Sequence, residues 1–101
     1  MSKNAIYYVS YKLKSKASVP DFLLAAEALN KGHISKQKGY ISSEQLFDGE
    51  RWADTIRFET MEDLKAFEDG SRNPDELAKH FYSFINLMSC RGHHFTLEKS
   101  Y

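Results

Sequence analysis

The stretch YISSEQLFDGERWADTIRF, residues 40–58, decides the fold that we expect for this chain. Two runs of period-two alternation, residues 40–47 and 51–58, flank the pair Asp48-Gly49. An Asp-Gly pair between two such runs is a strong signal for a β-hairpin, because both residues tolerate a positive φ. The alternation places Tyr40 and Phe47 on opposite faces of the first run. One face of the second run carries Trp52, Asp54, Ile56 and Phe58.

A strand is also predicted well before the hairpin, at AIYYVSYKL, residues 5–13. Both of its alternating sets are apolar, whereas a strand with one face in water alternates more cleanly. We therefore expect this strand to be covered on both faces. The first set holds Tyr7, Val9, Tyr11 and Leu13, and the second holds Ile6 and Tyr8.

Helical signals occupy the segment between this strand and the hairpin. Ser18 is suited to cap a helix, with Pro20 in the first turn, and the segment is predicted to end before Gly39. Its apolar stripe holds Phe22, Ala25, Leu29 and His33.

A second helical segment follows the hairpin. Thr60 is predicted to cap it, and Gly70 interrupts it. Asn73 is predicted to restart the helix as its N-cap, with Glu76 closing a capping box. Residues 91–99 are then predicted to form the last strand. The apolar stripe of the restarted helix runs through Leu77, Phe81, Phe84, Ile85 and Met88.

The predicted element order is β-α-β-β-α-β over a single domain, residues 1–101. This order is typical of the ferredoxin-like α+β fold, a four-stranded antiparallel sheet with two helices on one face. The other face has no helix, yet the chain carries seven Phe, six Tyr and one Trp, some of them predicted on that face. Exposed apolar patches mark interfaces, and twofold pairing is the commonest symmetry. We therefore expect a homodimer that pairs through its sheets.

Composition excludes several classes of protein. The 14 basic and 14 acidic side chains balance, which argues against nucleic acid as a partner. No run of about 18 apolar residues predicts a membrane span. A single cysteine and the lack of a secretory leader favour a cytoplasmic location. That cysteine, Cys90, is predicted to pack as a small hydrophobe.

The stretch DGERWADTIRFETMEDLKAF, residues 48–67, resembles the third strand and second helix of antibiotic-biosynthesis-monooxygenase-like proteins. These are members of the dimeric α+β barrel superfamily. The similarity in layout extends over the whole chain, including the first strand and KQKGY at residues 36–40. It implies a ferredoxin-like domain that pairs as a homodimer. It implies less about the reaction, because one fold hosts many chemistries.

The resemblance also implies a pocket between sheet and helices, in which a phenolic molecule is held while its anion reacts with oxygen. The leading hypothesis is a cofactor-independent monooxygenase acting on a small aromatic or quinol-type ligand. Asp54 and His80 are the predicted catalytic residues, either of which would take a proton. Tyr7, Tyr8 and Tyr11 are further hydrogen-bond donors. The predicted substrate-binding residues are Trp52, Tyr40, His33 and Phe67.

Structural roles for these residues stay open. Trp52 also fits a core or interface anchor, and Asp54 also fits a salt bridge to Arg57 or Arg91. His80 and His33 also fit packed or surface positions. No metal-site spacing of His, Cys and carboxylates occurs, so no metal ligand is predicted.

Two other functions stay open as well. The alternative to an enzyme is a dimeric ligand-binding or regulatory module without catalysis. The third hypothesis is a haem-degrading monooxygenase, the only one of the three that requires haem. Such enzymes resemble one another in an Asn on the first strand, a Trp in the second helix and a later axial His. Here Asn4 precedes the strand and Phe67 replaces the Trp, so only His80 matches.

Overall fold

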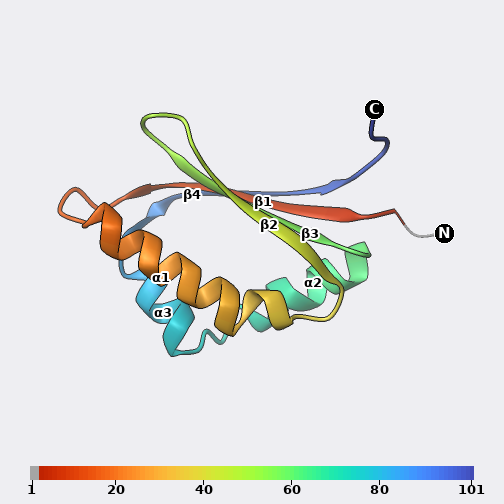
Figure 1. The fold of residues 1–101 in the computed structure, drawn as a ribbon, viewed down its shortest axis with the longest axis horizontal. Helices are drawn as coiled ribbons and strands as arrows, with labels where there is room; N and C mark the ends of the chain where they lie inside the picture. Colours follow the sequence, from red (N-terminus) through yellow and green to blue (C-terminus); the bar gives the residue numbers. More distant parts are fainter. Residues whose placement is uncertain (1–2) are drawn as a thin grey trace.

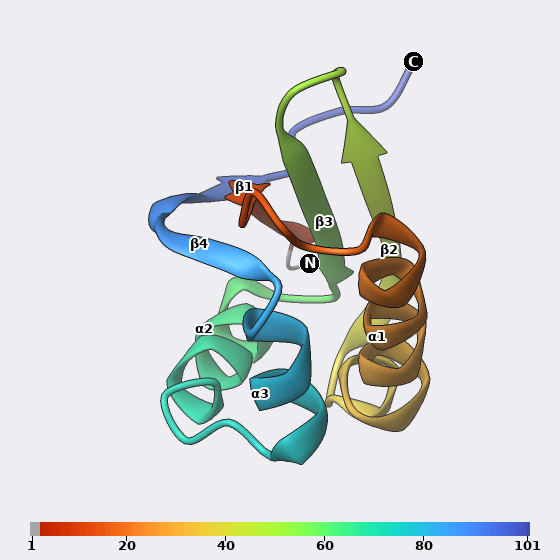
Figure 2. The same ribbon diagram turned by 90° about the vertical axis from the view of Figure 1, so that its left-hand side faces the viewer.

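The computed structural model describes residues 3–101 and contains one four-stranded antiparallel sheet, ordered β2-β3-β1-β4. The helices α1, α2 and α3 lie on the same side of the sheet, and the opposite face carries none (Figure 1, Figure 2). This arrangement confirms the predicted ferredoxin-like α+β fold. In chain order the elements are β1 (Ala5–Leu13), α1 (Val19–Gly32), the 3-10 turn η1 (Ile34–Lys36), β2 (Tyr40–Phe47), β3 (Trp52–Phe58), α2 (Met61–Gly70), α3 (Glu76–Tyr82) and β4 (Ile85–Thr96).

Strand β1 occupies the centre of the sheet and supplies both parts of the core. One cluster forms around Tyr11, whose ring packs edge-on against Phe22 and Phe81 at 6.1 Å. The other forms around Phe58 and includes Leu64 of α2, both of which are fully buried. Of the two alternating sets of β1, the one with Tyr7, Val9, Tyr11 and Leu13 faces the helices, because its members belong to these clusters. Within the described residues, no helix has the length and apolarity needed to cross a membrane.

The β2–β3 hairpin forms as predicted, but only half of its turn signal is used. Gly49 has a positive φ of 100°, whereas Asp48 does not leave the negative region. Asp48 contributes through its side chain instead. Its Oδ1 accepts hydrogen bonds from the backbone N–H groups of Glu50 at 2.8 Å and Arg51 at 2.7 Å. Strand β3 then begins at Trp52.

A β-bulge in β2 corrects the predicted faces of this strand. Tyr40 pairs with Phe58, but Ser42 pairs with the next residue, Arg57, so Ile41 is an extra residue. The insertion reverses the alternation once. Tyr40 therefore packs with the Phe58 cluster on the helix side, and Phe47 stacks on Trp52 on that same side. The prediction that Tyr40 and Phe47 point to opposite faces was wrong.

The helix starts at Ser18 and Thr60 are confirmed, since each side chain accepts a hydrogen bond from the backbone N–H three residues later. The end of the first helical segment differs from the prediction. Helix α1 stops at Gly32, where a Cβ would lie 2.6 Å from Leu77, and η1 fills the stretch before Gly39. Gly39 itself has a φ of 81°, which explains why glycine is suited to that turn.

The restarted helix was predicted wrongly at both ends. Its N-cap is Asp75 rather than Asn73, and the Asp75 carboxylate accepts from the N–H of Ala78 at 2.9 Å. The helix ends at Tyr82, and β4 begins at Ile85 instead of residue 91. Pairing with the end of β1 overrides the helical spacing of the apolar residues here. Met88, predicted on the helix stripe, is 97% exposed.

The two candidate caps differ in their expected effect on stability. Replacing Asp75→Ala removes the cap of α3 and should lower the free energy of unfolding by about 1 kcal/mol. Asp75→Asn keeps a capping oxygen and should cost less. The matched control Asn73→Ala should change stability by less than about 0.5 kcal/mol. Urea unfolding measures all three, and equal losses for Asp75→Ala and Asn73→Ala would contradict the assignment of the cap.

Candidate functional site

A cavity of about 330 Å³ lies between the helix side of the sheet and the helices, and we call it the main cavity. Strand β1 forms its roof and α2 and α3 form much of its wall. Most of its lining is apolar, as is usual for small-molecule sites. The apolar lining includes Val9, Leu29, Ile34, Ile56, Phe67 and Phe81, and the polar lining includes Tyr7, Tyr11, His33, Ser71, Tyr82 and Cys90.

Besides Tyr11, whose hydroxyl has a protein partner described below, two tyrosines line the main cavity from different elements. Tyr7 lies in β1 and packs edge-on against Phe67 at 6.1 Å, while Tyr82 ends α3. Burial raises the pKa of both Tyr7 and Tyr82 above the ordinary value of 10.0. Both phenols are therefore neutral at pH 7 and able to donate a hydrogen bond to a bound oxygen atom.

His33 follows the end of α1 and lines the main cavity, as does Phe67. The Nδ1 atom of His33 lies 3.6 Å from Oδ2 of Asp75, so a carboxylate faces one side of the imidazole ring. Asp75 thus serves two groups, because its other oxygen caps α3. His33 and Phe67 thus both line the main cavity, and their substrate-binding role stays a prediction.

A second cavity of about 290 Å³, the side cavity, opens between α1 and strands β2 and β3. It shares the wall residues Leu29, Ile34, Ile56 and Phe81 with the main cavity. Its remaining lining is more polar. The polar members are Glu27, Asn30, Ser43, Gln45 and Asp54.

Asp54 lies in β3 at the side cavity and is tied to the main cavity by one hydrogen bond. Tyr11 is one of the residues that line the main cavity, and its hydroxyl donates a hydrogen bond to Asp54 Oδ2 at 2.7 Å. Burial raises the pKa of Asp54 to about 6, although hydrogen bonds from Tyr11 and Gln45 oppose that shift. The expected salt bridge to Arg57 or Arg91 does not form within residues 3–101.

Tyr40 belongs to a polar network beside the side cavity rather than to the main cavity. Its hydroxyl lies 3.0 Å from Ser43 Oγ, and the Asn30 amide donates to both oxygens, at 3.5 Å and 2.7 Å. The phenol of Tyr40 therefore has protein partners already. This network joins α1 to the edge strand β2.

Like Tyr40, the predicted site residues Trp52 and His80 line neither cavity. Trp52 stacks on Phe47, with ring centroids 4.4 Å apart, and meets Phe22 edge-on at 5.1 Å. It acts as an anchor at the end of the core, the structural role left open above. The His80 side chain is exposed on α3, and its ring contacts only the edge of Phe84 among the aromatic groups described, at 5.2 Å.

Sequence reasoning missed several cavity residues. Tyr82 is the last residue of α3, whereas the sequence pattern predicted that the helix continues to Met88. The pattern therefore did not indicate that the Tyr82 side chain lines the main cavity. Cys90 was predicted as a packed hydrophobe, whereas it lines the main cavity and stays open to solvent. Asn30 and Gln45 carried no sequence signal, because isolated amides occur on most surfaces. Within residues 3–101, no three His, Cys, Asp or Glu side chains gather in a way that would hold a metal ion.

Solved structures with this fold include oxygenases. SnoaB, a cofactor-independent oxygenase from Streptomyces nogalater, superposes with a TM-score of 0.72 at 8% identity, covering 98% of this chain and 97% of that chain. A Nitrosomonas europaea protein, named "Putative antibiotic biosynthesis monooxygenase", gives 0.70 at 11% identity, with 97% and 93% covered. No family model matches the sequence, and no curated protein is significantly similar. The resemblance to antibiotic-biosynthesis-monooxygenase-like proteins is thus confirmed at the level of the fold.

A haem-degrading protein shares the fold as well. The heme-degrading protein Rv3592 from Mycobacterium tuberculosis gives a TM-score of 0.67 at 13% identity, covering 100% of this chain and 98% of that chain. The described residues of this chain do not fit haem at the expected axial position. His80 is exposed on the outer side of α3 and lines neither cavity.

The raised pKa of Asp54 makes a prediction about stability. The native state binds the Asp54 proton more tightly than the unfolded state, so this group's contribution to stability falls as pH rises from about 4 to about 6. Asp54→Asn removes that loss. Relative to wild type, the variant should gain at most about 3 kcal/mol of unfolding free energy between pH 4 and pH 7.

Urea unfolding at a series of pH values measures this difference. Glu44→Gln is the matched control, because it removes an exposed carboxyl from the neighbouring strand β2. It should show no comparable dependence on pH. A difference between Asp54→Asn and wild type that stays constant from pH 4 to pH 7 would refute the assignment.

Proposed function

We propose that this chain is a cofactor-independent monooxygenase that acts on a small aromatic molecule of the phenol or quinol type. The observation that carries the proposal is the apolar main cavity whose wall holds the imidazole of His33 and the neutral phenols of Tyr7 and Tyr82, with the Tyr11–Asp54 pair beside them. Ligand pockets commonly span about 300 to 1,000 Å³, so a cavity of about 330 Å³ fits a compact planar ring system. The fold shared with an oxygenase agrees with this proposal.

The walls and the polar groups have separate tasks in binding. Burial of the ring against Phe67, Ile56 and Phe81 supplies affinity in proportion to the apolar area removed from water. Tyr7 and Tyr82 donate hydrogen bonds to an oxygen of the ligand. Such bonds strengthen when that oxygen becomes an anion, so they favour ionisation of the bound phenol.

The Tyr11–Asp54 pair is the proposed route for the proton. Asp54 is mostly ionised at pH 7, because its pKa is about 6, and it accepts the Tyr11 proton while the Tyr11 oxygen receives the proton of the substrate. His80, the other predicted base, is too far out on α3 to share this task. Trp52 and Tyr40 have no part in the main cavity and are left out of the proposed mechanism.

The reaction balances without a cofactor. The substrate anion passes electrons to dioxygen, and a C–O bond forms to give a peroxide on the ring carbon. The O–O bond then breaks as that carbon loses its hydrogen. One oxygen atom remains as a carbonyl, and the other leaves with the hydrogen of that carbon as hydroxide, which takes back the proton held by Asp54 and becomes water. The substrate supplies all the electrons, so it is itself the reductant.

Oxygen consumption with hydroquinones and dihydroxynaphthalenes, which have one and two rings, tests the proposal. Asp54→Asn and Tyr11→Phe should each lower kcat by about 100-fold, because each breaks the proton route. In wild type, kcat should fall as pH drops below about 6, since the base must be ionised. His80→Ala is the matched control and should retain activity. Loss of activity in His80→Ala alone would overturn the proposed route.

A comparison of ligand binding with oxygen consumption distinguishes an enzyme from a binding module. A phenol that binds in the main cavity without consuming oxygen, at any pH between about 5 and 9, would favour the non-catalytic ligand-binding module. Intrinsic fluorescence is a poor probe here, because Trp52 lies outside the cavity. Chemical-shift changes at Tyr7 and Phe67 in an NMR titration report binding directly.

We also propose that two copies pair through the helix-free face of the sheet. Alternation from the helix-facing Tyr7 places Tyr8 on that face, where its ring lies 6.5 Å from Phe95 and 6.1 Å from His93. Phe95 is 52% exposed, and Leu46 of β2 is 47% exposed. Apolar exposure of this kind favours an isologous partner.

Sedimentation measures the pairing. Wild type should sediment as twice the chain mass of 11.7 kDa. Phe95→Lys places a charge in the proposed contact and should shift the protein towards the monomer. Leu24→Lys, which alters a 64% exposed residue of α1, is the matched control and should leave the dimer intact. A wild-type monomer at micromolar concentration would refute the pairing.

A further inference from the structure

Strand β4 carries a large bulge opposite Tyr11. Ser10 of β1 pairs with Arg91, and Lys12 pairs with Asn86, so the four residues 87–90 oppose Tyr11 alone. An ordinary bulge inserts one residue, and bulges occur often beside active sites. Two residues of this bulge, Leu87 and Cys90, line the main cavity. We call residues 87–90 the wall segment.

Ser89 ties the wall segment to β1. Its hydroxyl accepts the backbone N–H of Lys12 at 2.8 Å and donates to the carbonyl of Asn86 at 2.6 Å. The side chain thus replaces a ladder hydrogen bond that the bulge interrupts.

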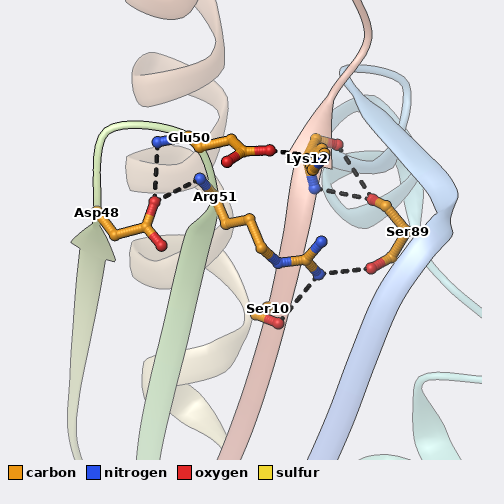
Figure 3. A network of polar contacts seen from close by, with 6 residues as sticks. All are labelled: Ser10, Lys12, Asp48, Glu50, Arg51 and Ser89. Carbon is orange, nitrogen blue, oxygen red and sulfur yellow. Dashed lines mark hydrogen bonds and ion pairs between the residues drawn. The ribbon is translucent and has the colours of Figure 1, made fainter.

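Arg51 makes the second tie, from the far side of β1. Its Nη2 atom donates to the carbonyl of Ser89 at 2.7 Å and to the hydroxyl of Ser10 at 3.1 Å, so the side chain crosses the central strand (Figure 3). Its own N–H is fixed by Asp48. Beside it, Glu50 pairs with Lys12 at 2.8 Å. The β2–β3 hairpin is therefore braced against the wall segment.

Apolar packing does little to hold the wall segment. Leu87 is 61% exposed and Met88 is 97% exposed, so little of their surface is removed from water. The hydrogen bond from the charged guanidinium to a backbone carbonyl is of the stronger kind. The position of the wall therefore depends mainly on Arg51 and Ser89.

We propose that Arg51 is a positioning residue that sets which aromatic ligands the main cavity accepts, by holding the wall segment in place. The inference rests on the proposed function, because it takes the main cavity as the ligand site. With the wall held, the cavity accepts compact two-ring phenols. With the wall released, Leu87 and Cys90 move outward and longer three-ring phenols fit.

The single cysteine gives a readout that needs no catalysis. Cys90 is in the wall segment, and its reaction rate with Ellman's reagent reports the position of that segment. Arg51→Met removes the donors but keeps an unbranched side chain, and it should raise the rate about tenfold. Burial raises the pKa of the Cys90 thiol, and the charge of Arg51 opposes that rise, so loss of the charge alone slows the reaction. Acceleration therefore reports movement of the wall.

Arg57→Met is the matched control. Arg57 lies near the far end of β3, whereas Arg51 directly precedes this strand, and among the side chains of residues 3–101 only that of Arg51 donates a hydrogen bond to Ser89. It should leave the Cys90 rate unchanged. Ser89→Ala removes the other tie while keeping Arg51, and it should also raise the rate. If Arg51→Met fails to fold by circular dichroism, Ser89→Ala decides the outcome. Unchanged Cys90 rates in the folded variants would overturn the proposal.

Ligand selection is measured with 2-naphthol and 2-hydroxyanthracene, whose binding is followed by their own fluorescence and by protection of Cys90. Wild type should prefer the two-ring phenol, and Arg51→Met should reduce that preference at least about fivefold. An unchanged preference would overturn the selective role of Arg51 even if Cys90 reacts faster.

The outcomes separate this inference from the proposed function. Binding and selection without oxygen consumption would contradict the monooxygenase and leave the role of Arg51 standing. If neither phenol protects Cys90 in wild type, the main cavity is not the ligand site, and both proposals fail. If oxygen is consumed but Arg51→Met behaves as Arg57→Met does, only this inference fails.

Discussion

The structure depends on β1 burying one face beneath all three helices while it holds the centre of the sheet. Large aromatic rings bury about 150–250 Å² each, so Tyr11 packed against Phe22 and Phe81 accounts for much of the core. The same residue brings a hydroxyl into an apolar interior, where it requires an acceptor. Asp54 supplies that acceptor on the neighbouring strand. The packing of one side chain thus creates the polar pair on which the proposed chemistry relies.

The sequence was most informative where local chemistry decides the structure. The hairpin at Asp48-Gly49 and the caps at Ser18 and Thr60 were predicted, because turns and helix starts depend on nearby residues. Prediction was wrong where distant pairing decides. The apolar residues after Tyr82 have helical spacing, yet the free edge of β1 draws them into β4. The bulge at Ile41 likewise depends on pairing with β3, and the residue types around it do not predict it.

The candidate site shows the same division. Phe67 was placed correctly by its helix stripe, and Asp54 by strand parity, since both patterns fix a face. A face alone does not tell which part of it meets a cavity. Trp52 shares the face of Asp54 but ends the core, because Phe22 and Phe47 cover its ring. His80 borders an apolar stripe and still points to solvent, because α3 spans only Glu76–Tyr82 and few residues pack against that side.

The hydrogen bond from the Arg51 guanidinium to the wall segment is accepted by the backbone carbonyl of Ser89, not by a side chain of this segment. A backbone carbonyl does not depend on which side chains stand at the neighbouring positions 87, 88 and 90. Leu87, Met88 and Cys90 are therefore free to change by mutation while the chain between them stays anchored. A lineage that needs a new ligand can reshape this part of the pocket one substitution at a time, with little loss of folding stability. The bulge is in this sense a place where side chains can be exchanged while the hydrogen bonds that hold the backbone are kept.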